Sequence, residues 1–278
     1  MILLDNVTYG YKRGKNIISN LSLEIPDGTI CGLLGRNGVG KSTMLYLISG
    51  LLRPQTGVIE CNGAIPAKRK VEFLNDIFLV PEEFELPNLV TSEYIGENAP
   101  FYPKFSYEDM EKYLALFELD TTVHIGKLSM GQKKKVFLSF AMACNTAVLL
   151  LDEPTNGLDI ISKRLFRQAI ASCMTDEKII IISTHQVYDV EKILDHVVIA
   201  ENQKILLNSN MTDISSKLSF SFTSDQHRIN SALLALPAPG GANIIEYVAA
   251  QDEETEVNLE SLFELTQVNP GEIQRLFH

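Results

Sequence analysis

A short glycine-rich segment, residues 35–42, sets narrow limits on how this chain can fold. Its sequence, Gly-Arg-Asn-Gly-Val-Gly-Lys-Ser, fits the pattern G-x-x-x-x-G-K-[S/T] in full. An apolar run at 29–34 precedes it, and a helical pattern at 44–52 follows it. A strand, a glycine-rich loop and a helix in this order form the context that a phosphate-binding loop requires.

The chemistry of such a loop predicts a nucleoside triphosphate site. Glycines let backbone N–H groups curl around phosphates, and the following helix directs its positive end at them. Lys41 would reach the β- and γ-phosphates, and the hydroxyl of Ser42 would ligate Mg²⁺. The loop alone leaves kinases, GTPases, helicases and transport ATPases open.

The pattern beyond the loop indicates an α/β fold. Apolar strands alternate with helices in the second half of the chain, which implies a parallel sheet covered on both sides. A helical insertion is expected at about 90–145, where no strand pattern is convincing. The expected strands are 2–8, 17–25, 29–34, 147–151, 178–183 and 196–200, and the expected helices are 44–52, 91–98, 107–119, 130–143, 159–174 and 186–194.

The last quarter of the chain differs in composition from the rest. Residues 206–278 contain 10 acidic and 3 basic residues, within a chain of net charge −11. Strand-like segments at 218–223 and 244–249, a helix at 259–266, a turn at 237–241 and a solvated loop at 252–254 suggest a small α+β unit. We therefore expect one domain at 1–207 and an acidic appendage at 208–278.

Charge and cysteine usage exclude several classes of partner and site. A net charge of −11 repels phosphate backbones, so no nucleic acid is expected as a partner. Cys31, Cys61, Cys144 and Cys173 lie far apart without a C-x-x-C pair, which favours buried free thiols in a reducing cytosol. No signal peptide is recognisable, and every apolar run is far shorter than the roughly 20 residues of a membrane helix.

Four further motifs follow the phosphate loop: L-S-M-G-Q at 128–132, V-L-L-L-D-E-P at 148–154, N-G-L-D at 156–159 and S-T-H at 183–185. In this order and spacing they resemble the nucleotide-binding subunits of ATP-binding cassette (ABC) transporters, in the bacterial exporter-like branch. The resemblance covers about residues 2–207. It implies a P-loop NTPase cassette of the α/β class, with a mainly parallel core sheet, an N-terminal antiparallel β part, a helical insertion and a small C-terminal α+β appendage.

The resemblance and the loop chemistry together define a candidate site for ATP and Mg²⁺. Asp152 and Glu153 end an apolar strand at the carboxyl edge of the sheet, where α/β folds place ligands. The resemblance implies that Asp152 holds Mg²⁺ through water, that Glu153 is the general base and that His185 contacts the γ-phosphate. The candidate catalytic residues are Lys41, Glu153 and His185; the nucleotide-contacting ones are Tyr11, Gly35, Asn37, Gly38, Gly40, Lys41, Ser42, Thr43, Ser129, Gly131, Gln132 and Asp159; the metal-binding ones are Ser42, Asp152 and Glu82.

Two positions depart from the family pattern. Met130 stands where the family usually has glycine, while its neighbours Ser129 and Gly131 remain. Residues 129–132 also fit the S-x-x-Q capping box of a helix, and this interpretation is compatible with an anion site. Glu82 stands where the family most often has glutamine, in the loop that joins the core to the helical region. The lysines at 133–135 are interpreted as a solvated helix face or a contact for an acidic partner.

A complete site in this family needs the phosphate loop of one chain and the Ser129 motif of another. The resemblance thus implies a head-to-tail pair with two ATP molecules between the subunits, either a homodimer or a pseudo-symmetric heterodimer. ATP hydrolysis would then drive integral membrane subunits, with the chain on the cytoplasmic face of the cell membrane.

Transport, and export in particular, is the leading functional interpretation. Residues 101–105, with the helix after them, and residues 133–144 look like bacterial exporter ATPases of the drug or antibiotic resistance type. The main alternative is a soluble cassette ATPase in iron–sulfur assembly or DNA repair. A small-molecule P-loop kinase is a further alternative, but it would not need the motif at 129–132.

Overall fold

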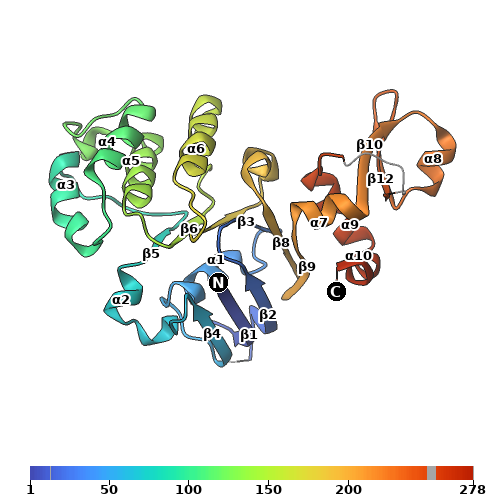
Figure 1. Cartoon of the computed structure of the whole chain (residues 1–278), viewed down its shortest axis with the longest axis horizontal. Coiled ribbons are helices and arrows are strands. Elements are labelled where there is room, and N and C mark those ends of the chain that lie inside the picture. The colour runs from blue at the N-terminus through green and yellow to red at the C-terminus, as the bar shows by residue number, and fades with distance from the viewer. Residues whose placement is uncertain (13, 249–254, 278) are drawn as a thin grey trace.

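A six-stranded sheet forms the centre of the molecule in the computed structural model, which describes residues 1–12, 14–248 and 255–277 (Figure 1). The strands from β5 to β8 in spatial order are parallel, and the edge strand β9 runs antiparallel to β8. In spatial order the sheet consists of β5 (Ile77–Val80), β6 (Val148–Asp152), β7 (Ile179–Thr184), β3 (Thr29–Leu34), β8 (His196–Glu201) and β9 (Lys204–Asn210).

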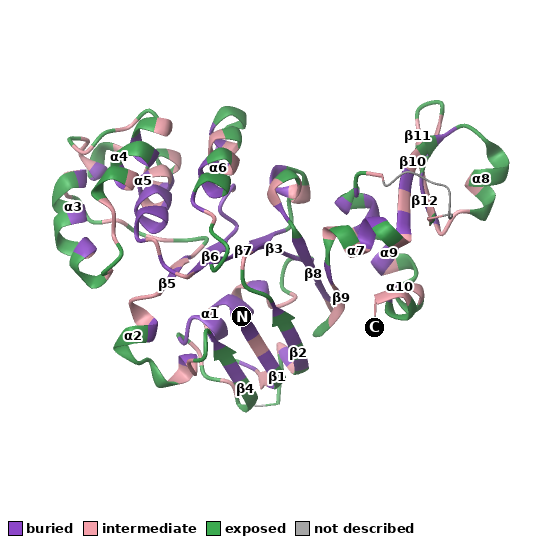
Figure 2. Ribbon diagram, in the orientation of Figure 1, coloured by how far each residue is buried: buried purple, intermediate pink, exposed green. Residues whose placement is uncertain are grey.

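The inner strands of this sheet are buried on both faces (Figure 2). Successive side chains of a strand point to opposite faces, so each inner strand contributes to two cores. Cys31 and Leu33 pack toward α1 (Lys41–Ile48) and an antiparallel sheet, whereas Ile30 and Leu34 pack toward the helical side. The antiparallel sheet has the order β2 (Ile18–Ile25), β1 (Ile2–Tyr9) and β4 (Thr56–Cys61).

Helices cover the other face of the central sheet. The region expected to be helical contains α3 (Thr91–Asn98), α4 (Tyr107–Leu116) and α5 (Met130–Ala143), and its described residues form no strand beyond an isolated bridge at Val90. Helix α6 (Ile160–Ser172) contacts α4. Aromatic rings pack the helical region against the sheet, through Phe78, Tyr94, Tyr102, Phe105 and Phe140.

The C-terminal elements lie at the opposite end of the molecule from the helical region (Figure 1). They comprise α7 (Met211–Lys217), β10 (Leu218–Thr223), α8 (Gln226–Ser231), β11 (Leu234–Ala238), β12 (Gly241–Tyr247), α9 (Leu259–Val268) and α10 (Pro270–Phe277). The strands form an antiparallel sheet in the order β10, β12, β11. Residue 207 lies inside β9, and Leu218, Ile245 and Leu262 belong to one hydrophobic cluster with Ile199 and Leu207. The loop expected at 252–254 lies outside the described residues.

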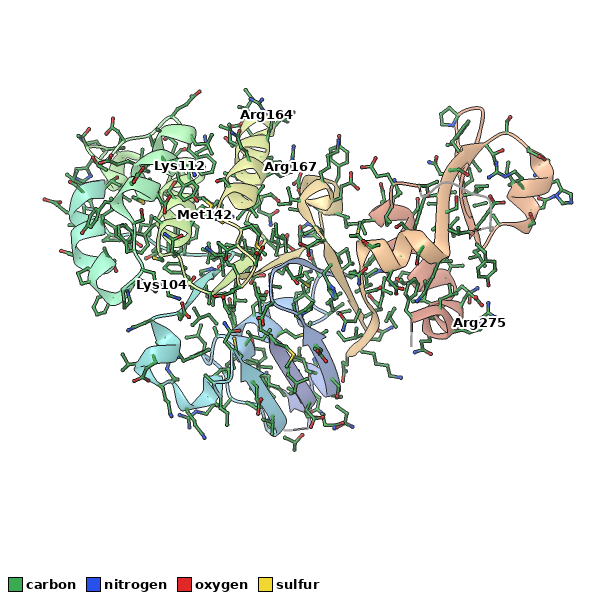
Figure 3. All side chains as sticks on the ribbon, in the orientation of Figure 1. Lys104, Lys112, Met142, Arg164, Arg167 and Arg275 are labelled. Atoms are coloured by element: carbon green, nitrogen blue, oxygen red, sulfur yellow. The ribbon has the colours of Figure 1, made fainter. Side chains whose placement is uncertain are left out.

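One expected helix is absent from the described residues, and several short elements were not expected. Residues 186–194 form two 3₁₀ turns, Val187–Asp189 and Glu191–Ile193, in place of an α-helix. Arg167 lies on α6 (Figure 3). One of its guanidinium N–H groups donates to the carbonyl of Asp189 at 2.9 Å, so this carbonyl accepts a tertiary bond instead of a helical one. The elements that the sequence did not predict are β4, β5, β9, β11, α2 (Val71–Leu74), α7, α8 and α10.

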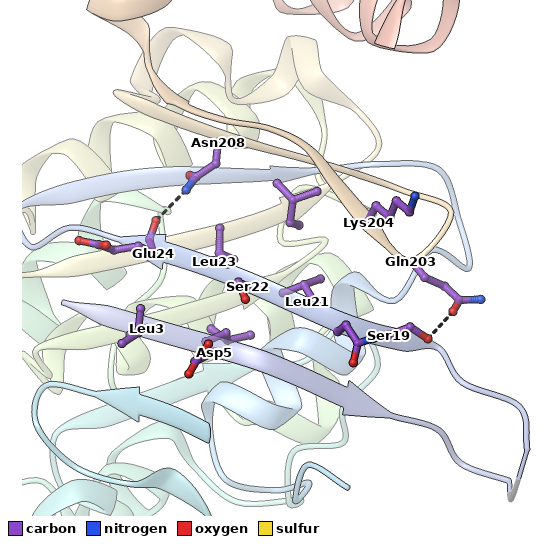
Figure 4. Close-up of a pocket in the computed structure, with 13 residues that line it drawn as sticks. Leu3, Asp5, Ser19, Leu21, Ser22, Leu23, Glu24, Gln203, Lys204 and Asn208 are labelled. Atoms are coloured by element: carbon purple, nitrogen blue, oxygen red, sulfur yellow. Dashed lines mark hydrogen bonds between the residues drawn. The ribbon is translucent and has the colours of Figure 1, made fainter. Parts of the chain in front are cut away.

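A groove of about 760 Å³ separates β2 from β9, the facing edge strands of the two sheets (Figure 4). Two side-chain hydrogen bonds cross it. Asn208 Nδ2 donates to the carbonyl of Glu24 at 3.1 Å, and Ser19 Oγ donates to Gln203 Oε1 at 2.8 Å. These bonds hold the antiparallel sheet against the central sheet. Tyr11, two residues after the end of β1, is held with it.

No helix among the described residues is long and apolar enough to cross a membrane.

All four cysteines are free and buried, as expected from their spacing. Burial raises the pKa of the thiols, that of Cys61 to about 12.

Candidate nucleotide-binding site

The phosphate loop connects a fully buried strand, β3, to the start of α1. Gly38 and Gly40 have φ values of 84° and 106°, in the left-handed region that favours glycine. The loop curls around Lys41, whose Nζ donates to the carbonyl of Gly35 at 2.9 Å and to that of Arg36 at 3.4 Å. The ammonium group therefore lies inside the loop, at the positive end of α1.

A cavity of about 360 Å³ opens at this loop. Most of the sequence-predicted site residues line it. Its lining consists of Tyr11, Ile17, Asn37, Gly38, Gly40, Lys41, Ser42, Thr43, Glu82, Glu153 and His185. The hydroxyl of Tyr11 lies 3.3 Å from Oγ1 of Thr43, and 58% of the tyrosine is exposed. An exposed aromatic ring at the mouth of a phosphate cavity suits a contact with a nucleobase. Ile17 is a lining residue that the motifs did not identify.

The carboxylate of Glu153 is held by Thr184, the last residue of β7, and by His185, which follows it. Its Oε2 accepts from Oγ1 of Thr184 at 3.0 Å, and its Oε1 accepts from the backbone N–H of His185 at 3.1 Å and lies 2.8 Å from that residue's Nδ1. Nζ of Lys41 is 3.6 Å from the same Oε1. This acidic group is thus oriented from several sides while it faces the cavity.

The candidate metal ligands are only partly brought together. Ser42 and Glu82 line the cavity, whereas Asp152 does not and accepts a hydrogen bond from Oγ of Ser183. Hydroxyl and carboxylate oxygens are donors that Mg²⁺ prefers, so the residues present fit this ion. No group of three or more His, Cys, Asp or Glu side chains in the described part of the chain could hold a metal. An ion at Ser42 would therefore depend on phosphate oxygens and water for its remaining ligands.

Glu82 takes part in a chain of hydrogen bonds that the motifs did not predict. Nδ2 of Asn156 donates to Oε1 of Glu82 at 2.9 Å, and Nε2 of Gln186 donates to Oδ1 of Asn156 at 3.2 Å. The chain connects the loop after β5, the turn after β6 and the residue after His185. Three segments that surround the cavity are thereby linked through neutral amides.

The remaining candidate residues lie outside the cavity lining. Ser129 and Gln132 form the expected capping box of α5. The backbone N–H of Ser129 donates to Oε1 of Gln132 at 3.0 Å, and the backbone N–H of Gln132 donates to Oγ of Ser129 at 3.3 Å. A Cβ at Gly131 would lie 3.0 Å from the carbonyl oxygen of Gly157, so glycine lets α5 approach the turn after β6. Asp159 caps α6, and hydrogen bonds from Ser162 lower the pKa of its carboxyl group.

The interpretation of residues 133–135 as a solvated face is wrong for the middle lysine. Lys134 is 5% exposed, and its Nζ donates to the carbonyls of Glu153 at 3.2 Å and Asn156 at 2.9 Å. Burial lowers the pKa of its amino group. The signal in the sequence is that Lys134 extends the helix face of Leu138 and Ala141 by one turn.

Comparison with known proteins decides which family this site belongs to. Residues 18–156 match the protein family described as ABC transporter. The chain belongs to the ABC transporter family. It is an ABC-type ATP-binding subunit with ATPase activity, as predicted, and the alternative in iron–sulfur assembly or DNA repair is not favoured.

Relatives and a solved structure of the ABC family cover most of this cassette. A putative ABC transporter ATP-binding protein of Archaeoglobus fulgidus is 35% identical over 210 residues, which are 72% of this chain and 86% of the relative. The bacitracin transport ATP-binding protein BcrA of Bacillus licheniformis is 34% identical over 196 residues, 68% of this chain and 63% of the relative. A dimeric ATP-binding cassette bound to ADP and Pi in a post-hydrolysis state has a TM-score of 0.66 and 25% identity, covering 76% of this chain and 98% of its own. The predicted P-loop NTPase fold is confirmed.

Proposed function

We propose that this ABC ATPase works as a head-to-tail dimer that binds two Mg-ATP molecules and powers export through separate membrane subunits. The observation that carries the proposal is a division among the candidate residues. Lys41, Ser42 and Glu153 line one cavity, whereas Ser129 and Asp159 are exposed and lie outside it. A second chain is the simplest source of the contacts that Ser129 and Asp159 would make with a nucleotide in this cavity.

The proposed chemistry assigns one role to each group in the cavity. Lys41 and the loop N–H groups hold the β- and γ-phosphates, and Tyr11 contacts the adenine. Glu153 accepts a proton from the attacking water, since its carboxylate is oriented by Thr184 and faces the Lys41 ammonium. The side chain of His185, beside that carboxylate, contacts the γ-phosphate. A metal ion held by Ser42, with Glu82 near it and Asp152 acting through water, would neutralise charge on the phosphates.

The other half of each site comes from the partner in this proposal. Ser129 and Gly131 present the N-terminus of α5, a helix of 14 residues, to the γ-phosphate bound by the partner chain. The capping box leaves Ser129 exposed, and Gln132 in the first turn of α5 and Asp159 at the N-cap of α6 are exposed as well. Met130, 58% exposed, adds bulk at the position where the family usually has glycine.

A second groove supports docking of a membrane subunit. It has a volume of about 560 Å³ and lies between the core and the helical region, beside Pro81 of the loop that carries Glu82. Leu51, Val71 and Phe101 on its rim are 58%, 66% and 67% exposed. An apolar rim next to the nucleotide-contacting loop fits a short helix of a membrane subunit on the cytoplasmic face. Movement of Glu82 would be transmitted to that helix through the adjacent Pro81.

The direction of transport and the domain division are parts of the same proposal. Export is supported by the segments at 101–105 and 133–144 and by the likeness to a bacitracin transport protein. We propose a catalytic domain that ends with β9 and a C-terminal unit, α7 to α10, that contacts a partner or regulates the ATPase. The C-terminal unit contains none of the candidate site residues.

Trapping of the dimer tests the proposal. In Glu153→Gln the amide keeps the shape of the side chain, removes the base and relieves repulsion with the phosphates. With Mg-ATP, light scattering after size exclusion should show a dimer for this variant and a smaller dimer fraction for the wild-type chain. Glu153→Gln combined with Ser129→Asp is the control, because an acidic group at the partner's phosphate should abolish the dimer. A variant that binds ATP at saturation and stays monomeric would contradict the head-to-tail arrangement.

A further inference from the structure

Lys134 is a buried cation directly beside the turn that carries Glu153. It lies on α5, one turn after the capping box, and its side chain is almost completely enclosed. Its neighbours Lys133 and Lys135 are only half-buried. An ammonium group is costly to remove from water unless it is paired and hydrogen-bonded, so its enclosure here calls for a structural reason.

The partners of Lys134 supply that reason. Nζ donates to two backbone carbonyls, those of Glu153 and Asn156, which lie at the two ends of one tight turn. The N–H of Asn156 closes this turn on the carbonyl of Glu153 at 3.2 Å. The negative charges of Glu82, Glu153 and Asp152 oppose the effect of burial on the amino group. Lys134 thus holds the turn by charged hydrogen bonds.

The turn needs to be held because its first residue has an unfavourable backbone conformation. Glu153 has a φ of 44°, in the left-handed region that non-glycine residues rarely adopt because the conformation is strained. Rotation of Glu153 toward an ordinary φ would swing both its carbonyl and its carboxylate. Two charged hydrogen bonds on this turn resist such a rotation.

We propose that Lys134 is a positioning residue for ATP hydrolysis, which fixes the turn 153–156 and thereby the carboxylate of Glu153. This inference rests on the role proposed above for Glu153. Lys134 also connects two halves of the dimer site: its helix begins beside Ser129, and its ammonium contacts the turn of Glu153. If α5 shifts when it contacts the nucleotide bound by the partner, the side chain of Lys134 would transmit this displacement to Glu153 of the same chain.

Replacement of Lys134 by Met and by Gln tests the inference. Met keeps the length and removes the donors, whereas Gln keeps donors without charge. We expect Lys134→Met to lower kcat by about tenfold or more, because small displacements of a reacting group are costly, while the Kd for ATP changes less than about twofold. Lys134→Gln should recover at least about threefold of the lost kcat. Lys133→Met and Lys133→Gln are matched controls on the same helix and should keep wild-type kcat.

A double-mutant cycle separates positioning of Glu153 from a general structural effect. In a Glu153→Gln background, Lys134→Met should change the remaining single-turnover rate by less than about twofold, because its target is already gone. The inference would be overturned by a kcat of Lys134→Met within twofold of wild type, or by a loss of ATP affinity as large as the loss of kcat. It would also be overturned if Lys134→Met lowered the rate equally in the wild-type and Glu153→Gln chains. If Lys134→Met does not fold, Lys134→Gln against Lys133→Gln decides in the same way. Undiminished turnover of the single variant Glu153→Gln would instead refute the role of Glu153 as the base. The head-to-tail dimer would still be tested separately by light scattering.

Discussion

The ammonium group of Lys41 lies 3.6 Å from Oε1 of Glu153, and both side chains are almost fully buried. Each group is also held by neutral partners, Lys41 by the carbonyl of Gly35 and Glu153 by Oγ1 of Thr184. Phosphate oxygens carry more charge than a carboxylate, so bound ATP would become the main partner of Lys41. Glu153 would keep its bonds to Thr184 and His185 and would face the γ-phosphate as a base.

Removal of the Lys41 ammonium should affect both binding and turnover. Lys41→Ala is expected to abolish measurable phosphate release and to raise the Kd for ATP by at least about tenfold, roughly 1.4 kcal/mol. It also leaves the buried carboxylate of Glu153 without its cationic neighbour. Isothermal titration with ATP and a phosphate-release assay measure the two effects. Lys104→Ala, which removes only a surface ion pair with Asp76, is the control. Near-normal turnover of Lys41→Ala would contradict the assignment of the loop.

The two acidic residues of the cavity should respond differently to neutralisation. Glu82 is exposed and bonded to an amide of Asn156, so Glu82→Gln should change ATP affinity by less than about threefold, roughly 0.6 kcal/mol. Its turnover or Mg²⁺ dependence should change modestly. Glu153→Gln should lower turnover by the order of a hundredfold or more, as expected for loss of a general base. Both variants are to be compared in one steady-state assay across a range of Mg²⁺ concentrations. An inactive Glu82→Gln with an active Glu153→Gln would reverse the two roles.

Truncation should separate catalysis from the C-terminal unit only if β9 is kept. A chain that ends at residue 210 retains the complete ladder between β8 and β9, whereas one that ends at 207 loses three residues of that strand. The 1–210 chain should bind ATP with a Kd within about threefold of the full chain. The 1–207 chain should have the lower melting temperature of the two, because β9 closes the edge of the sheet. Calorimetry and ATP titration on both chains measure this. A folded 1–210 chain without ATP binding would show that α7 to α10 belong to the site.

Sequence patterns were reliable where local chemistry dictates the structure. The helix α5 begins and ends where its capping box and apolar face predicted. Of residues 37–43, all except Val39 line one cavity. The predicted absence of strands in the helical region also holds for its described residues.

The misses arise from contacts between distant segments. The helix expected at 186–194 yields to 3₁₀ turns because Arg167 binds the Asp189 carbonyl, and Lys134 is buried because the turn of Glu153 offers it two acceptors. Strand β9 is partly polar, and its pairing with β8 identifies it. The helix face of Leu138 and Ala141 indicates that Lys134 is buried, but no local pattern identifies the distant groups that these residues bind.

The groove between β2 and β9 also has a consequence for the behaviour of the chain at high concentration. An open strand edge invites pairing with another molecule, and here the two open edges face each other at close range. The bonds from Asn208 to Glu24 and from Ser19 to Gln203 span the gap without a backbone ladder. Each edge therefore shields the other from strand exchange between molecules, and loosening these two contacts would expose both edges to pairing with a second chain.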